Sequence, residues 1–465
     1  MFSCMSLKVL SFLFFVNASI MHVDASGKEK VYQDESFVVI ISIDGFPADA
    51  LWNIEAPVPF LRSLASNGSW AHAMIASNPT VTWPNHTSLV TGVHPEKHSL
   101  LLNAQIIRPD EGRIPVSRDG RKDKYDLVAV PTLYDIAYGA GLRTAEVNWP
   151  GTRNASTLHD SFPDTPDNVT HITPRLRNEL IDLGILDDET PSALWRHSPV
   201  GRDLVWTETA NHLIRTRKPH VLLLHLLNVD GTHHRYGVNT NPGFTALGLA
   251  DAHVKMVVET LKEEGIYEQT TLFIVSDHGF INTPKTIFPN VLLHQHELIQ
   301  ISGDGNFESG RAQAQTMGGS AMIYLDDPSD EELRNQITEI FQNTEGILRV
   351  VQPEQFPDYG LPMPEDNEQM GDIFIAADYG YALNGSLRPE LPMVDTVEYG
   401  LTYGHHGFIT DLKQMETLFI AYGRGIKSGV VLDEVDNRSV APTAAHLLGL
   451  QFETADGTVL EEILE

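Results

Sequence analysis

Cysteine is almost absent from the chain, which has a single one, Cys4, among 465 residues. A disulfide within the chain is therefore excluded, and stability has to come from a large apolar core or from bound metal ions. The 42 % hydrophobic and 20 % charged residues are an ordinary globular mixture. The length is sufficient for a core of that kind.

Positive charge is also scarce, because 32 Lys and Arg stand against 62 Asp and Glu, for a net charge of −30. No basic run and no arginine stripe is visible. Such a field repels nucleic-acid backbones and anionic membrane surfaces. The composition therefore argues against binding of nucleic-acid polymers. An enzyme acting on phosphate esters would need local positive charge here, and metal ions are one way to supply it.

A long hydrophobic run is missing as well. Lys8 precedes an apolar run over residues 9–16, which is too short to span a bilayer comfortably, and Val23-Asp24-Ala25 offers a cleavage site before Ser26. We predict a signal peptide over residues 1–25, export to the periplasm or secretion, and no stable membrane anchor after cleavage. Export without cysteine favours a bacterial periplasm.

Apolar runs that suit buried strands alternate with amphipathic helical patterns. FVVIISI at 37–43 and VLLLHLL at 221–227 suit strands buried on both faces, and helical periodicity covers 204–216 and 244–263. The same strand–helix–strand rhythm continues over residues 321–324, 331–342 and 348–351. The pattern predicts an α/β fold with a doubly wound, mostly parallel sheet and helices on both faces.

Three stretches break this rhythm and are rich in Pro, Asp, Asn and Arg: residues 101–126, 152–198 and 280–319. We interpret them as loop insertions over the active site, so that residues 26–465 form a single catalytic domain. No internal repeat and no low-complexity tract is visible, and nothing in the sequence indicates an oligomeric state.

Acidic and histidine residues fall at the ends of the predicted strands. They occur in ISIDGF, NVDGTHHRYG and FIVSDHGF, as Asp44, Asp230, His234, Asp277 and His278. The carboxyl ends of strands in an open α/β sheet face the ligand crevice, so these side chains should converge. Divalent cations would neutralise the charge, and mixed carboxylate and imidazole ligands suit Zn²⁺, with manganese or iron possible.

Other histidines are ambiguous at this stage. YGHHG adds His405 and His406, and the residues alone do not say which of them binds. His225 lies inside a strand and is interpreted as structural, and His233 as a non-ligand. A strand-end Asp before Gly is also a common turn former, so each motif alone is modest evidence.

The stretch NPTVTWPNHTSLVTG, residues 78–92, places Thr82 in a distinctive turn. Pro84 should keep Trp83 out of the helical region, and Asn85 suits the N-cap of a short helix that Gly92 ends. Thr82 would then stand just outside a helix N-terminus, a good place for a nucleophile that attacks an anion. The alternative is an ordinary proline turn with a surface threonine.

Taken together, these motifs resemble the nucleotide pyrophosphatase/phosphodiesterase (type I phosphodiesterase) family of the alkaline phosphatase superfamily. The matching pieces are IDGF, PTVTWPNHTSLVTG followed by HPEKHSLLLN, WPG, NVDGTHHRYG, SDHGF and GHHGF. They run from Asp44 to Phe408 and so span nearly the whole mature chain. The resemblance implies an alkaline-phosphatase-like fold.

The resemblance also implies two zinc ions per chain. The first would be held by Asp44, Thr82, Asp277 and His278. The second would be held by Asp230, His234 and His406, because the family's ligand histidine directly precedes a glycine.

In this resemblance Thr82 is the nucleophile of an in-line displacement at phosphorus, through a phosphothreonine intermediate. Asn103 matches the donor of a hydrogen bond to a phosphoryl oxygen, and Trp83 stands where an aromatic often stacks on a nucleobase. Small phosphodiesters, nucleotides or pyrophosphates are the implied substrates. The disulfide-rich modules of animal members are absent, so their partner functions do not transfer.

Two alternatives stay open. A phosphomonoesterase of the same superfamily would need extra positive groups, and Arg153 or Lys97 are candidates without a motif. A non-catalytic, metal-stabilised binding protein would need neither Thr82 nor Asn103. The motif of sulfatases is missing.

Overall fold

The computed structural model describes residues 22–23, 29–30, 36–188, 190, 193–303 and 305–465. In the first of two units, strand β1 (His22–Val23) pairs antiparallel with β2 (Glu29–Lys30). The second unit begins at Ser36 and contains every predicted site residue. The predicted signal peptide lies outside the described residues except for 22–23. Within the described part, no helix combines the length and apolarity needed to cross a membrane.

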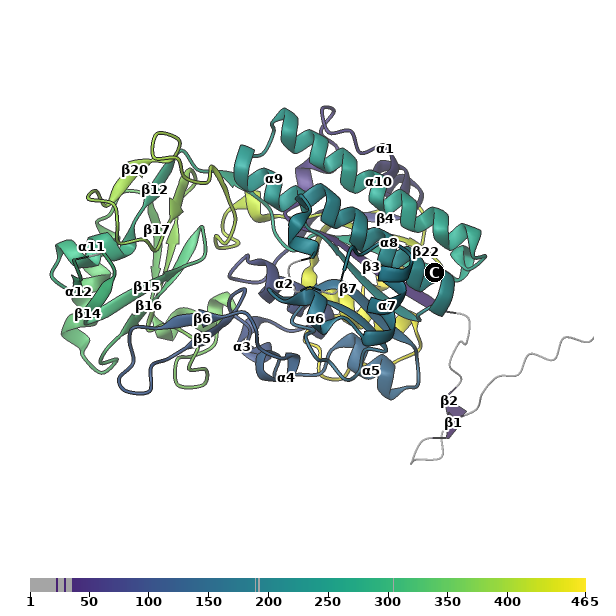
Figure 1. The fold of residues 1–465 in the computed structure, drawn as a ribbon, viewed down its shortest axis with the longest axis horizontal. Coiled ribbons are helices and arrows are strands. Elements are labelled where there is room, and N and C mark those ends of the chain that lie inside the picture. Colours follow the sequence, from purple (N-terminus) through teal and green to yellow (C-terminus); the bar gives the residue numbers. More distant parts are fainter. Residues whose placement is uncertain (1–21, 24–28, 31–35, 189, 191–192, 304) are drawn as a thin grey trace, which may run out of the picture. The chain divides into compact units, whose positions relative to one another are not determined.

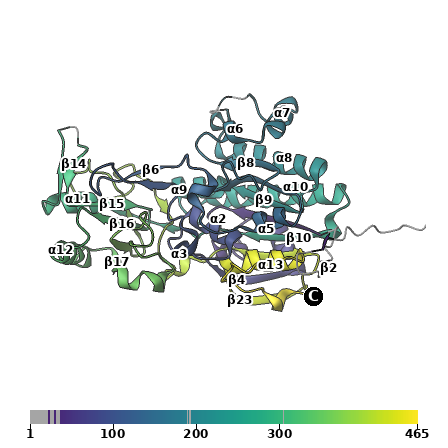
Figure 2. The same cartoon turned by 90° about the horizontal axis from the view of Figure 1, so that it is seen from below.

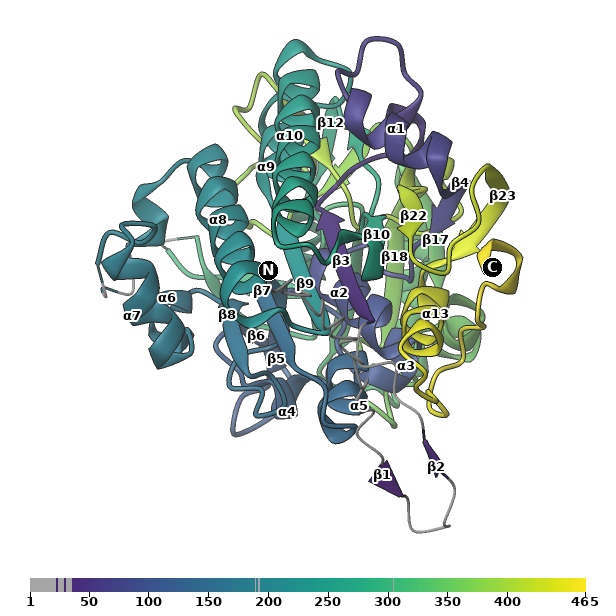
Figure 3. The same cartoon turned by 90° about the vertical axis from the view of Figure 1, so that its right-hand side faces the viewer.

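The main sheet has eight strands, which Figure 3 shows side by side. Their order is β23 (Val430–Asp436), β4 (Ser69–Ile75), β22 (Phe419–Gly423), β10 (Thr270–Val275), β3 (Phe37–Ile43), β9 (Val221–Leu226), β7 (Thr144–Pro150) and β8 (Asp160–Asp164). Strand β22 runs antiparallel to both of its neighbours, and every other pair is parallel. The predicted α/β fold with a mostly parallel sheet is confirmed.

Strand β3 shows why the apolar run has no polar face. Val39, Ile41 and Ile43 belong to one hydrophobic core, and Val38 and Ile40 belong to another. Side chains alternate across a strand, so both faces of the sheet need a cover. Figures 2 and 3 show these covers: α1 (Pro59–Asn67), α8 (Pro199–Arg217) and α10 (Asn241–Glu263) on one face, and α2 (Thr82–Thr91), α5 (Leu133–Gly139) and α13 (Val440–Leu447) on the other.

A second sheet, green in Figure 1, is antiparallel throughout. Its order is β15 (Ala312–Thr316), β16 (Ser320–Leu325), β18 (Ile373–Ala377) and β17 (Ile347–Val351), with helix α12 (Glu331–Gln342) between β16 and β17 in sequence. The structure confirms the strands predicted at 321–324 and 348–351 and the helix predicted at 331–342. The prediction that they continue the parallel main sheet was wrong, because they belong to this second sheet. These strands also pack on both faces, so their apolar runs look like those of central parallel strands.

The three predicted insertions contain regular structure of their own. Residues 101–126 form the hairpin β5 (Gln105–Ile107) and β6 (Ser117–Asp119), which packs on the second sheet. Residues 152–198 contain β8, the last strand of the main sheet, with α6 (Asn168–His171) and α7 (Pro174–Asp182). Residues 280–319 supply β15 of the second sheet.

The remaining elements are short apart from α9, which follows β9. They are α3 (Pro95–His98), α4 (Lys124–Leu127), α9 (Asn228–Tyr236), β11 (Ile281–Asn282), β12 (Lys285–Ile287), α11 (Pro289–Gln295), β13 (Ile299–Ile301), β14 (Phe307–Gly310), β19 (Tyr381–Leu383), β20 (Met393–Asp395) and β21 (Gly404–His405).

Helix α2 begins earlier than the sequence pattern predicts. Its N-cap is Val81 and Thr82 is its first residue, so Trp83 is helical and Asn85 lies inside the helix. The predicted exclusion of Trp83 and the predicted Asn85 cap were therefore wrong. Pro84 is tolerated because it lies in the first turn, where backbone N–H groups have no intrahelical partner. The helix ends at Gly92, as predicted.

Candidate active site

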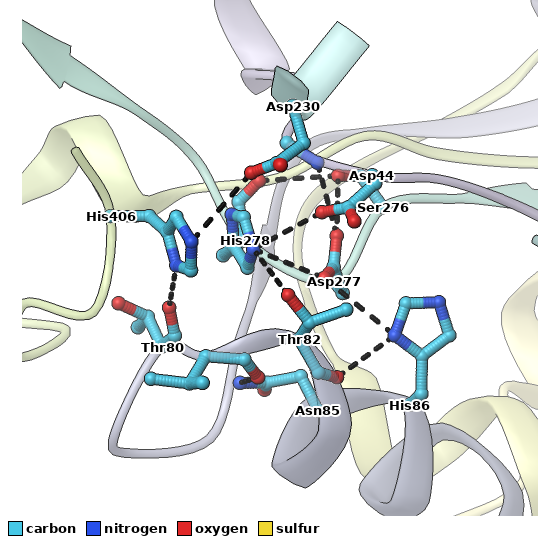
Figure 4. A network of polar contacts seen from close by, with 12 residues as sticks. Asp44, Thr80, Thr82, Asn85, His86, Asp230, Ser276, Asp277, His278 and His406 are labelled. Carbon is cyan, nitrogen blue, oxygen red and sulfur yellow. Dashed lines mark hydrogen bonds and ion pairs between the residues drawn. The ribbon is translucent and has the colours of Figure 1, made fainter. Parts of the chain in front are cut away.

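The first candidate cluster lies at the carboxyl ends of β3 and β10. These strands are parallel neighbours, with Ser42 opposite Val275, so the residues that follow them meet. His278 Nε2 lies 3.2 Å from Asp44 Oδ1 and 3.1 Å from Asp277 Oδ2. All three side chains are buried, and Figure 4 shows His278 between the carboxylates.

Thr82 faces this cluster from the first turn of α2. Its Oγ1 lies 3.4 Å from His278 Nε2. Asn85, one turn further on, fixes the approach to the helix because its amide NH₂ group donates to the carbonyls of Ser77, Pro79 and Val81. The nucleophile predicted from the sequence is thus held by the helix and by the loop before it.

The second candidate cluster adjoins the first. Asp230 and His234 lie one turn apart on α9, and His234 Nε2 is 3.2 Å from Asp230 Oδ1. His406 Nε2 lies 3.6 Å from the same oxygen. The neighbouring His405 instead directs Nε2 at the Thr402 carbonyl, 3.0 Å away. The structure therefore places His406, and not His405, beside Asp230.

The two clusters share His278. Its ring stacks on His406 with 3.6 Å between centroids and 4° between planes. Ligand atoms of Asp44, Asp277 and His278 lie within 4.8 Å of one another, and so do those of Asp230, His278 and His406. The seven predicted metal ligands are thus brought together at one place: Asp44, Thr82, Asp230, His234, Asp277, His278 and His406.

His406 comes from a segment that runs between the two sheets. The amide of Gly407 donates to the Thr80 carbonyl at 2.9 Å, and the amide of Gly319, beside β16, donates to the His406 carbonyl at 2.8 Å. A Cβ at Gly407 would lie 1.8 Å from the Met317 carbonyl oxygen, so no side chain fits there. We refer to residues 404–408 as the strap.

The three candidate histidine ligands share one orientation. Each directs Nδ1 at a backbone carbonyl: His234 at Gly404 (2.8 Å), His278 at Gly279 (3.2 Å) and His406 at Thr80 (3.0 Å). A carbonyl only accepts hydrogen bonds, so Nδ1 carries a proton and Nε2 faces the cluster, where the neutral ring offers its lone pair to a cation. Metal-binding histidines are held in this way by their surroundings.

Several carboxylate oxygens at the site lack hydrogen-bond donors. Asp44 Oδ1, Asp230 Oδ1 and Asp277 Oδ2 are buried and accept no hydrogen bond from the described residues. Buried polar atoms are nearly always satisfied, so each such atom needs an explanation. Divalent cations bound to these oxygens and to the nearby Nε2 atoms would satisfy them, and the donor set fits such ions.

The electrostatics of the first cluster point the same way. Burial raises the pKa of Asp277 to about 8, and the charge of Asp44 adds to this effect. Burial alone would lower the pKa of His278, but the carboxylates of Asp277 and Asp44 outweigh it and raise that pKa to about 9. Without a cation the cluster therefore retains protons at neutral pH, and a bound cation would replace them.

His225 was interpreted from the sequence as structural, and it is buried, but it also contacts the site. Its Nε2 lies 3.1 Å from Asp44 Oδ2 and its Nδ1 lies 2.9 Å from the Asn148 carbonyl. It therefore fixes one oxygen of Asp44 while the other faces His278. The available signal was a histidine inside an otherwise apolar strand run, one residue before the end of β9 and opposite Ser42 of β3.

Asn103 and Trp83 occupy the substrate side of the centre. Asn103 Oδ1 accepts a hydrogen bond from the Trp83 backbone amide at 2.9 Å. The amide NH₂ of Asn103 has no partner among the described residues. Asn103 lines a cavity of about 280 Å³ that also contacts His234 and His406. This group is thus available to donate to a ligand next to the clusters.

The indole of Trp83 is held by packing. It is 6 % exposed and lies against Leu100, Leu127 and Val128. Its Nε1 donates to Asp164 Oδ2 at 2.9 Å, a contact that sequence reasoning did not anticipate. Stacking of Trp83 on a nucleobase stays a prediction, and this burial does not favour it.

Comparisons with known proteins agree with the geometry. The model of the type I phosphodiesterase/nucleotide pyrophosphatase family matches residues 38–409. Human ectonucleotide pyrophosphatase/phosphodiesterase family member 1 is 24 % identical over 434 residues, which cover 90 % of this chain and 40 % of that protein. Rat family member 7 is 22 % identical over 435 residues, which cover 91 % of this chain and 86 % of that protein.

Solved structures show the same fold. An inactive variant of murine ectonucleotide pyrophosphatase/phosphodiesterase 5, in complex with AMP, matches with a TM-score of 0.68 and 18 % identity, covering 93 % of this chain and all 100 % of that one. The human counterpart also matches with a TM-score of 0.68. The predicted enzyme class, a phosphodiester hydrolase, is confirmed at the level of the family. From its motifs, its fold and the family match, the chain belongs to the type I phosphodiesterase/nucleotide pyrophosphatase family.

Proposed function

We propose that this chain is an exported two-zinc phosphodiesterase or nucleotide pyrophosphatase that hydrolyses small phosphodiester or pyrophosphate substrates. The observation that carries the proposal is the position of Thr82 Oγ1, 3.4 Å from His278 Nε2 at the edge of the carboxylate and imidazole clusters. The names of the relatives support this activity, and the AMP complex of the murine protein supports a nucleotide as ligand.

The residues present fit two metal ions. Asp44, Thr82, Asp277 and His278 would hold the first, and Asp230, His234 and His406 would hold the second. Zinc at these positions would offset the negative charge of the clusters, lower the pKa of the Thr82 hydroxyl and stabilise charge on the phosphoryl oxygens.

The chain's own groups then divide the work. Thr82 Oγ1 attacks phosphorus in line with the leaving oxygen, the bond to that oxygen breaks, and Thr82 becomes a phosphothreonine. Attack by water on the same phosphorus releases the product and restores the hydroxyl. The amide NH₂ of Asn103 donates to a non-bridging phosphoryl oxygen, and His225 keeps Asp44 in place.

The proposal includes the cellular setting. Residues 1–25 are removed as a signal peptide, and residues 26–465 act as a single catalytic domain in the periplasm or after secretion, without a stable membrane anchor. The net charge of −30 supports small substrates over nucleic-acid polymers. N-terminal sequencing of the exported protein should begin at Ser26, and an intact leader would contradict this part of the proposal.

A phosphomonoesterase remains the second candidate because one observation favours it. Arg118 lines the same cavity as Asn103 and His406, so a positive group is available near the centre. A doubly charged monoester would benefit from such a group more than a singly charged diester.

A paired assay of zinc-loaded protein separates these functions. Bis-nitrophenyl phosphate should be cleaved faster than nitrophenyl phosphate. Thr82→Ala should lower the rate about 1000-fold or more, since it removes the nucleophile. Thr91→Ala, a buried threonine of the same helix, is the matched control and should retain activity. Preference for the monoester would favour the phosphatase, and zinc binding without turnover would favour a binding protein.

Metal analysis tests the two-zinc part separately. Protein purified without chelator should contain about two equivalents of zinc per chain. One equivalent, or magnesium alone, would contradict it.

A further inference from the structure

Helix α9, which carries Asp230 and His234, begins without an N-cap side chain of its own. It starts at Asn228, with a single residue between it and strand β9, so its N-cap position falls on Leu227. The apolar side chain of Leu227 cannot accept a hydrogen bond, whereas α8 and α10 are capped by the side chains of their own N-cap residues. The first backbone N–H groups of a helix have no partner within it. The start of α9 therefore needs acceptors from outside the helix.

Asp203, on the neighbouring helix α8, supplies these acceptors. Its Oδ1 accepts the backbone amide of Leu227 at 2.8 Å, and its Oδ2 accepts the backbone amide of Asn228 at 3.1 Å. The Asp203 side chain is buried, so water does not compete for these contacts. Hydrogen bonds to an ionised carboxylate are stronger than those between neutral groups, and negative charge at this end also suits the helix dipole. Asp203 thus caps α9 from a different helix.

The start of α9 and the candidate ligands on it form one rigid piece. Asp230 lies two residues after Asn228, and His234 lies one turn after Asp230. Pro199, in the first turn of α8, also lies next to this piece, because a Cβ at Gly231 would be 3.7 Å from Pro199 Cγ. A displacement of the first turn of α9 would therefore move the carboxylate of Asp230 relative to the rest of the second cluster.

Helix α1 is capped in the same way but carries no candidate ligand. Its N-cap residue, Val58, makes no side-chain cap. Asp251, on α10, accepts the backbone amide of Leu61 on Oδ1 at 2.7 Å and that of Phe60 on Oδ2 at 3.2 Å. Asp251 is also buried. The chain therefore contains a matched pair of aspartates that cap a neighbouring helix through both carboxylate oxygens, and only one of the two capped helices reaches the candidate centre.

We infer that Asp203 is a positioning residue for the second metal cluster, which acts by fixing the start of α9 and with it Asp230 and His234. This inference rests on the proposed function, because it concerns one ion of the proposed centre. Asp203 acts only through α9, since its carboxylate oxygens are given to the backbone of that helix. Loss of a contact that orients a metal ligand commonly lowers metal affinity 10–100-fold.

The zinc affinities of the two clusters test this role. Asp203→Asn should lower the affinity of the second cluster about 10-fold, because the amide NH₂ group cannot accept one of the two backbone hydrogen bonds. The affinity of the first cluster should change less than about twofold. Asp251→Asn is the matched control and should leave both affinities within about twofold. Competition with a zinc-binding dye measures them, and the binding step that Asp230→Asn removes identifies the second cluster. Equal effects of Asp203→Asn and Asp251→Asn, or no effect of Asp203→Asn, would overturn the inference.

Amide hydrogen exchange in metal-free protein tests the geometry without zinc or turnover. Asp203→Asn should speed exchange of the Leu227 and Asn228 amides about 10-fold or more and leave the amides at the start of α1 unchanged. Asp251→Asn should have the opposite pattern. Unchanged exchange at Leu227 and Asn228 in the Asp203→Asn protein would show that Asp203 does not hold the start of α9, which overturns the inference.

Activity separates this inference from the proposed function. At limiting zinc, Asp203→Asn should lower the rate with bis-nitrophenyl phosphate about 10-fold, and excess zinc should restore it to within about twofold. Zinc binding and turnover in the unaltered protein without a response to Asp203→Asn would overturn this inference alone. Absence of zinc or of turnover in the unaltered protein would contradict the proposed function.

A second variant covers the case in which Asp203→Asn does not fold. Asp203→Glu keeps the charge, but its longer side chain displaces the start of α9. The affinity of the second cluster for zinc should then fall while that of the first cluster is retained. Unchanged affinity of the second cluster in Asp203→Glu would overturn the inference.

Discussion

The two candidate metal clusters use the same ligand types in different settings. Asp44, Asp277 and His278 follow central strands and are at most 1 % exposed, with His225 behind Asp44. The side chains of the second cluster, on α9 and the strap, are 10–31 % exposed. Backbone carbonyls orient its two histidines, His234 and His406. A ligand set that is rigid and dry should hold its ion more tightly than one that is partly solvated. The two ions of the proposed centre should therefore differ in how readily they leave.

The largest contrast should come from removing one carboxylate of each cluster. Asp44→Asn and Asp230→Asn should each lower diesterase activity about 1000-fold, because the proposed reaction needs both ions. Asp44→Asn should also cost about 3–5 kcal/mol in the free energy of unfolding, since it leaves buried His225 without its ionic partner and leaves His278 with Asp277 alone. Asp230→Asn should cost much less. Urea unfolding of chelator-treated protein measures the free energy of unfolding of both variants. Equal losses would contradict the proposed difference between the two clusters.

Chelation should separate the clusters in time. Dialysis against a chelator should remove one equivalent of zinc about 10–100-fold faster than the other, because the orienting contacts of the second cluster are fewer. Activity should fall with the first equivalent. Metal analysis and activity measured on the same samples give the result. Loss of both ions at the same rate would contradict the predicted difference between the two clusters.

His225 offers a way to weaken the first cluster without touching a ligand. His225→Gln should lower the affinity for the more tightly held ion about 10-fold, because Asp44 loses the contact that orients it. His253→Gln replaces another buried histidine, which contacts Thr207 Oγ1 on the helical layer, and should leave zinc affinity unchanged. Competition with a zinc-binding dye measures both. If His225→Gln instead weakened binding of the less tightly held ion, His225 would support the second cluster, which would contradict this prediction.

The smallest effect should be on the pH dependence of stability. Without metal, the pKa of His278 is about 9, above its ordinary value, so its contribution to stability is complete below pH 6.5 and is lost as the pH rises through 9. Asp277, with a pKa of about 8, acts in the same direction. Bound zinc keeps both groups deprotonated. The difference in Tm between loaded and chelator-treated protein should therefore widen by a few degrees from pH 6.5 to 9, and a constant difference would contradict this coupling.

Much of the main sheet was predictable because its central strands are buried on both faces. A run such as 37–43 has no polar position, and few structures other than a buried strand accommodate that. The same argument failed to distinguish the second sheet, because apolar runs do not encode which strands pair or in which direction. Strand β8 was hidden in a stretch rich in polar residues, DSFPD, which gives no periodic signal.

The site was predictable to the extent that strand ends meet. Asp44, Asp277 and His278 followed from that argument, whereas His406 needed the resemblance to a family because YGHHG follows no strand that the sequence predicts. The environment of Trp83 was not predictable, since its partners Leu100, Leu127 and Asp164 come from other segments. Trp83→Phe would keep most of the packing and lose only the bond to Asp164.

The strap makes the proposed metal centre depend on the second sheet. His406 is held beside Asp230 from both sides of the strap, because its carbonyl accepts the amide of Gly319, beside β16, and the amide of Gly407 donates to the Thr80 carbonyl, just before α2. The candidate ligands of the first cluster all precede the second sheet in the sequence, whereas His406 follows it. A chain that lacks the second sheet or misplaces it would therefore keep the residues of the first cluster without completing the proposed two-ion centre.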